Sequence, residues 1–194
     1  MKPFIKLILA LAPLIAVAAG CGKLIPGGGG VNLFEGENAA KAASAIKQKV
    51  GAEKVNVIRA EVRPDKMTIQ IQSPANPKDI DEYTYERGSV SGPEPVQIFL
   101  GRTADKHHMA EIGEINFSVL PRTIERAIQL AGSEGAKVDQ ISMDANYAAT
   151  ANPALKGTPE GSKWALTWRI FVQGTRVQKS FWADQKGNLN EKPL

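Results

Sequence analysis

Residues 164–189 read WALTWRIFVQGTRVQKSFWADQKGNL, and this stretch decides the fold that we predict for the chain. Two runs rich in aromatic and branched residues flank Gln173-Gly174. A glycine at the second position of a two-residue turn accepts the positive φ that a tight hairpin needs. The turn therefore predicts a hairpin register in which Ile170 pairs with Val177. One face of this hairpin is almost wholly apolar and needs a covering layer.

The opposite face of the predicted hairpin has the composition that protein interfaces favour. It carries Arg169, Phe171, Arg176 and Trp182. Aromatic anchors and arginines supply a large part of the binding energy in such interfaces. We expect these four residues to form a binding face for a protein or peptide. The alternative is that the rest of the sheet, or the long loop before the hairpin, covers them. Trp168 lies on the apolar face and is expected in the core.

The hairpin ends in an Asp-x-x-Gly turn, Asp184 to Gly187, in which the carboxylate accepts from backbone amides and the glycine takes a left-handed conformation. Together with the preceding strands, this turn resembles the closing hairpin of PepSY-like domains over most of residues 115–192. The resemblance implies a small α+β binding or inhibitory module of the cell envelope, without catalytic residues. An inhibitor resembling the tandem-repeat β-lactamase inhibitory proteins is one version of that function.

Apolar spacing of three and four residues predicts two helices, at residues 37–49 and 120–131, each followed by a glycine. Alternating and branched apolar residues predict the strands. These are expected at 55–62, 67–72, 83–88, 96–100, 138–145, 164–172 and 176–184.

The same order of elements occurs twice, which suggests an internal repeat. Phe34 aligns with Phe117 and Ile69 with Trp168, with an insertion in the second copy between residues 146 and 163. The alternative is an independent helix-then-hairpins arrangement. We predict an α+β fold with two tandem helix-plus-antiparallel-sheet units behind a flexible lipidated leader. The expected division is a signal peptide at 1–20, a lipidated glycine-rich tether at 21–36, a first unit at 37–100, a connector at 101–114 and a second, PepSY-like unit at 115–194.

The leader has the features of an export signal. Lys2 and Lys6 precede an apolar segment that is shorter than the ~20 residues needed to cross a bilayer, and small residues end it. The run Ala18-Ala19-Gly20-Cys21 resembles the lipobox of bacterial lipoproteins, departing from its commonest pattern at Ala18. The resemblance implies cleavage before Cys21 and its acylation; the alternative is a plain secretory signal. In lipoproteins of double-membraned bacteria, an Asp directly after the lipidated cysteine marks retention at the inner membrane. Position 22 is Gly, which implies an outer-membrane protein facing the periplasm if the host has an outer membrane.

Composition excludes several other functions. The formal net charge is only +4 and the charges of both signs are scattered, so we expect no nucleic-acid partner. Cys21 is the only cysteine, which excludes an internal disulfide. The two histidines, His107 and His108, are adjacent, and neighbours on a strand point to opposite faces, so no metal site is expected. We predict a membrane-anchored, non-enzymatic module without cofactor that binds an unidentified envelope protein or peptide. A structural accessory of envelope assembly or maintenance is the alternative.

Overall fold

The computed structural model describes residues 31–97, 104, 109–144, 166–176 and 178–189. Five predicted features lie outside these residues: the signal peptide, Cys21, the glycine run of the tether, the two histidines and the insertion at 146–163.

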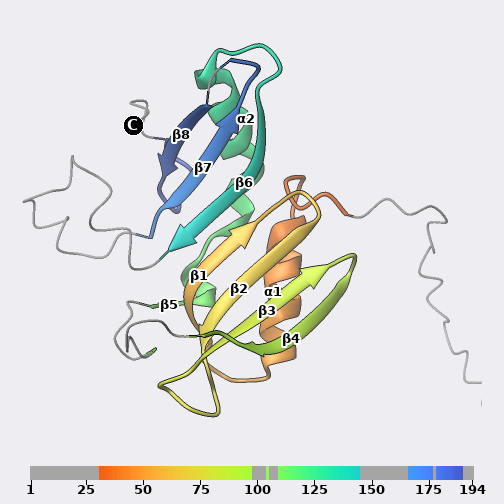
Figure 1. The fold of residues 1–194 in the computed structure, drawn as a ribbon, viewed down its shortest axis with the longest axis vertical. Coiled ribbons are helices and arrows are strands. Elements are labelled where there is room, and N and C mark those ends of the chain that lie inside the picture. The colour runs from red at the N-terminus through yellow and green to blue at the C-terminus, as the bar shows by residue number, and fades with distance from the viewer. Residues whose placement is uncertain (1–30, 98–103, 105–108, 145–165, 177, 190–194) are drawn as a thin grey trace, which may run out of the picture.

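The described residues form an α+β fold in which one antiparallel sheet carries two α-helices (Figure 1). The sheet has eight strands in the order β4-β3-β2-β1-β6-β7-β8, and β5 pairs with β1 beside this path. The helices are α1 (Asn38–Val50) and α2 (Leu120–Ala131). Two short 3-10 helices, η3 (Ile112–Glu114) and η4 (Phe117–Val119), precede α2. The strands are β1 (Asn56–Val62), β2 (Lys66–Gln72), β3 (Ile80–Glu86), β4 (Ser89–Pro95), β5 (Ala110–Glu111), β6 (Lys137–Asp144), β7 (Trp168–Gln173) and β8 (Gln178–Ala183).

Both predicted helices are present, and glycines end them as expected. Gly51 follows α1 with φ +69° and Gly132 follows α2 with φ +60°, the left-handed conformation in which glycine commonly stops a helix. Pro121 lies in the first turn of α2, where a missing backbone N–H costs nothing.

Pairing of β1 with β6 joins all the strands into one sheet, a contact that the sequence analysis did not foresee. Val62 pairs with Ile141 across this junction. The strands that follow α1 therefore continue directly into the strands that follow α2 (Figure 1).

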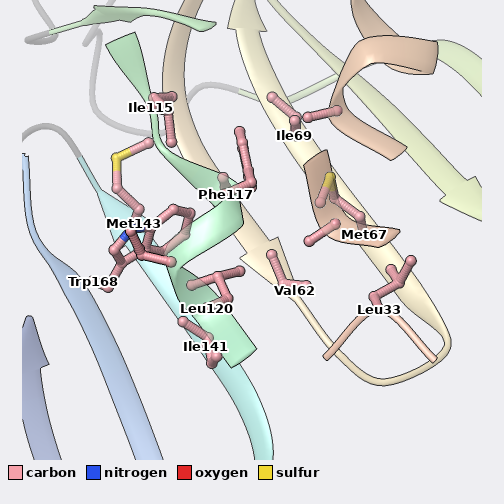
Figure 2. Packing of buried hydrophobic residues seen from close by; sticks show 14 of the residues in the cluster. Leu33, Val62, Met67, Ile69, Ile115, Phe117, Leu120, Ile141, Met143 and Trp168 are labelled. Carbon is pink, nitrogen blue, oxygen red and sulfur yellow. The ribbon is translucent and has the colours of Figure 1, made fainter. Parts of the chain in front are cut away.

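A single apolar core fills the space between the helices and one face of the sheet. Phe117 lies between the β1–β2 side and the β6–β7 side of this core (Figure 2). Its ring meets the edge of Trp168 at 5.3 Å between ring centroids, and Trp168 is fully buried, as predicted. A smaller cluster, Ile58, Ile80 and Ala104, lies apart from this core.

The fourth strand lies earlier in the chain than predicted. Residues 89–95 form β4, whereas a strand was expected at 96–100, of which only 96 and 97 are described and neither is in a strand. β4 contains Pro93 and Pro95, which argue against a strand in the middle of a sheet. An edge strand tolerates them, because one side of its backbone needs no partner, and β4 is an edge strand.

The register of the β7–β8 hairpin also differs from the prediction. Ile170 pairs with Phe181 and not with Val177, so residues 174–177 form the connection in place of a two-residue turn. Thr175 explains the longer loop: its backbone N–H and its hydroxyl both donate to the backbone oxygen of Glu134, at 3.3 and 3.1 Å. The loop is therefore held against the segment that follows α2.

The folded part begins within the segment that was assigned to the tether. Leu33 is fully buried in the main core, and its N–H donates to the backbone oxygen of Pro64 at 2.6 Å. The chain therefore enters the fold beside the turn between β1 and β2.

Candidate functional site

The face of the sheet turned away from the main core carries polar, charged and aromatic side chains, and we call it the helix-free face. Residues that pair across neighbouring antiparallel strands share a face, so the pairing register identifies its members. One continuous row crosses six strands: Thr84, Thr68, Glu61, Ser142, Arg169 and Trp182.

An ion-pair cluster occupies the middle of the helix-free face. The Glu61 carboxylate lies 3.5 Å from Arg59 Nη2 and 2.9 Å from Arg63 Nε. Arg63 also donates to Gln140 Oε1 at 3.1 Å, which links β1 to β6. The side chains of Arg59 and Arg63 are 46% and 52% exposed, so these pairs add little stability and leave positive charge at the surface.

A hollow of about 230 Å³ adjoins this cluster, lined by Glu61, Arg63, Lys66 and Thr68. No ion pair or hydrogen bond involves the Lys66 ammonium within the described part of the chain. Sequence reasoning missed this cluster. The signal was present as charges at every second position, 59, 61 and 63, which one face of a strand must share.

Arg169 lies between two aromatic rings on the same face. Its guanidinium carbon is 4.5 Å from the centre of the Phe171 ring and 5.4 Å from that of Trp182. These distances are typical of cation–π contacts, which hold the flat guanidinium in place.

The structure thus brings together three of the four residues predicted as a binding face, Arg169, Phe171 and Trp182. Arg176 does not join them, because it lies in the 174–177 connection, where it is exposed. Trp182 is only 8% exposed and does not stand open to solvent as the sequence analysis expected. Arg169 lies over its ring and contributes to this burial.

The predicted Asp-x-x-Gly turn is present beside α2. The Asp184 carboxylate accepts from the backbone N–H groups of Lys186 and Asn188 at 2.8 and 2.9 Å and from the Asn188 amide at 2.8 Å. Burial acts to raise the pKa of Asp184, but these hydrogen bonds and the Lys186 charge together lower it. Gly187 has φ +80°, the left-handed conformation that the motif predicts.

A second concave region lies on the other side of the molecule, between α1 and the segment 112–118. It measures about 290 Å³ and is lined by small, apolar and polar residues, among them Ala40, Lys47, Ile115 and Phe117. None of its described lining residues is acidic.

Two negative findings apply to the described residues alone. No cluster of three or more His, Cys, Asp or Glu in them is arranged to hold a metal ion. None of the helices found there has both the length and the apolar character needed to span a membrane.

Comparison with known proteins relates this chain to a solved structure by fold. The crystal structure of a "putative lipoprotein" from Clostridium difficile 630 superposes with a TM-score of 0.51 at 11% sequence identity, covering 84% of this chain and 98% of the other. No family model matches the chain, and no curated protein matches its sequence. The resemblance to PepSY-like domains stays a prediction from the motif.

Proposed function

We propose that this chain is a lipid-anchored protein of the bacterial cell envelope whose helix-free face binds a protein partner without catalysing a reaction. The observation that carries the proposal is the combination of Arg169 and its two aromatic rings with the exposed Arg59 and Arg63 on one face. Such composition concentrates binding energy at protein interfaces.

The anchor rests on the sequence around Cys21, which resembles a lipobox, and is supported by a protein of similar fold that is itself described as a lipoprotein. Acylation of Cys21 would attach the chain to the membrane ahead of Leu33, which packs beside the β1–β2 turn. An outer-membrane position facing the periplasm is part of the proposal and follows from Gly22.

We also infer that the fold consists of two tandem units. Each helix is followed by strands that pair in chain order, β1-β2-β3-β4 after α1 and β6-β7-β8 after α2. The helix-free face then extends across both units, which gives it a larger area than one unit would offer.

A structural accessory of the envelope is the second candidate. The low exposure of Trp182 favours it, because a face that is covered within the molecule cannot serve as an interface.

Co-purification from native membranes under mild detergent separates the two. Thr68→Trp places a bulky side chain in the central row of the helix-free face, and tryptophan is a residue that β-strands accommodate well. Lys41→Trp, on the exposed side of α1, is the matched control. The proposal expects a partner with the parent chain and with Lys41→Trp, and its loss with Thr68→Trp. Equal recovery with all three chains would overturn it.

A further inference from the structure

Arg169 has donors that nothing in the described part of the chain satisfies. An arginine side chain carries five N–H donors. The Nε of Arg169 is buried and has no hydrogen-bond partner, and no described residue accepts a hydrogen bond from its guanidinium. A buried donor without an acceptor costs on the order of 1–3 kcal/mol, and Nε carries this cost. The two Nη groups are not among the buried atoms without a partner, so they are the donors that an outside acceptor can reach.

The acid of the central row is not available to Arg169. Glu61 is separated from it by Ser142, which pairs with both residues. The Glu61 carboxylate contacts Arg59 and Arg63 instead.

The two rings leave Arg169 suited to one kind of ligand. Phe171 and Trp182 lie against the guanidinium and restrict its motion. A guanidinium held in this way presents its N–H groups as a fixed fork, which matches the two oxygens of a carboxylate.

The register of the sheet also singles out Arg169 among the cations of this face. Arg59 lies opposite Asp144, and Lys66 lies opposite Glu86. Arg169 lies opposite Ser142 and Trp182, so neither of its cross-strand neighbours is an acid, and its charge favours an acidic ligand.

We propose that Arg169, held by Phe171 and Trp182, is a receptor for an aspartate or glutamate carboxylate of an acidic segment in the partner protein. This inference rests on the proposed function and names the chemistry of the partner. Arg169 contributes the bidentate hydrogen bonds to that carboxylate.

Binding of a synthetic probe to the full-length purified chain tests this inference. The probe is a hexaglutamate peptide with both ends blocked, titrated at low salt and followed by tryptophan fluorescence, with blocked hexaglutamine as the uncharged comparison. The parent chain is expected to bind hexaglutamate and not hexaglutamine. Arg169→Gln should weaken this binding by about tenfold or more, because charged hydrogen bonds are worth ~1.5–3 kcal/mol.

Arg176→Gln is the matched control, since it removes the same charge from the exposed connection between β7 and β8. It should leave the affinity within about twofold, because the fork lies elsewhere. Arg169→Lys, which keeps the charge but not the fork, should lose most of the affinity that Arg169→Gln loses. The inference is overturned if Arg169→Gln and Arg176→Gln weaken binding equally, or if hexaglutamine binds as well as hexaglutamate.

Two further measurements separate a loss of binding from a loss of folding, and separate the carboxylate receptor from the proposed function. A rise in the unfolding temperature of the parent chain with hexaglutamate, and none with hexaglutamine, tests carboxylate binding even if Arg169→Gln folds poorly. The second measurement is co-purification with the Arg169→Gln chain. If the partner still co-purifies with this variant, the carboxylate receptor is overturned and the proposed function stands.

Discussion

Gly187 shows how one residue fixes the end of the last hairpin. At φ +80°, a Cβ built on Gly187 would lie 2.9 Å from Thr123 Oγ1 and 3.1 Å from Arg122 Nη2. Gly187→Val should therefore lower the free energy of unfolding by more than ~1 kcal/mol, through the strained φ and the crowding against α2. Chemical denaturation measures this loss. Gly113→Ala is the control, because Gly113 has an ordinary φ and a Cβ there would meet only Glu111 Oε1, at 4.0 Å. Equal midpoints for the two variants would contradict the turn.

Asp184, in the same turn, should make stability depend on pH. Its pKa is lower in the folded chain than in the unfolded chain, where an aspartate has a pKa of about 3.9. Its contribution to stability is therefore fully present above the unfolded pKa and is lost as the pH falls through the folded pKa. Asp184→Asn should lower stability at neutral pH and reduce the loss of stability between about pH 5 and pH 3. Unfolding midpoints across that range check the prediction, and parallel curves for both chains would refute it.

The sequence pattern predicted the burial of side chains correctly on the face of the sheet that the helices cover. It failed on the opposite face, where a side chain from a neighbouring strand covers Trp182. Trp168 was assigned to the core by its position on the apolar face, and it is fully buried. Trp182 was assigned to an open face, yet the cross-strand neighbour Arg169 lies over it. Periodicity shows which way a side chain points but not which long side chain folds across it.

At the level of elements, the helices could be predicted almost to the residue, because apolar spacing and terminal glycines are local signals. The register of β7–β8 could not, because Thr175 is held by Glu134, which is distant in the sequence. The predicted faces nevertheless survive: the pairing moved by an even number of residues, so Arg169 and Phe171 keep their side of the sheet.

Paired cysteines can test the observed register. Phe171 pairs with Ser180 in the structure, whereas a two-residue turn would pair it with Arg176. In a Cys21→Ser background, Phe171→Cys with Ser180→Cys should form a disulfide on mild oxidation, since directly paired strand residues lie within bonding range. Phe171→Cys with Arg176→Cys is the control and should stay largely reduced. Mass spectrometry measures disulfide formation in both chains. A disulfide that forms preferentially between positions 171 and 176 would contradict the observed register and support the two-residue turn.

For the whole molecule, the junction between β1 and β6 is what local sequence signals could not reveal. Nothing in Val62 or Ile141 specifies that one strand will pair with the other; both read simply as strand residues. The junction places Arg59 of β1 and Arg169 of β7 on one surface, although they are far apart in the chain.

The membrane attachment that we propose concerns the whole chain and rests on one residue, Cys21. Cys21→Ser should abolish incorporation of a fatty-acid analogue and release the chain from membranes, because acyl chains contribute roughly 0.8 kcal/mol per buried methylene. Metabolic labelling and fractionation measure both effects. If the variant still incorporates the analogue as strongly as the parent, Cys21 does not carry the lipid anchor.

The central claim is that the helix-free face meets a protein partner, and site-specific photo-crosslinking in living cells tests it most directly. A photoreactive amino acid is placed at Thr68, in the central row of that face, and separately at Lys41, on the exposed side of α1. The account predicts a discrete crosslinked species from Thr68, absent from Lys41 and reduced by Arg169→Gln. The opposite pattern, with a discrete crosslinked species from Lys41 and none from Thr68, would contradict it.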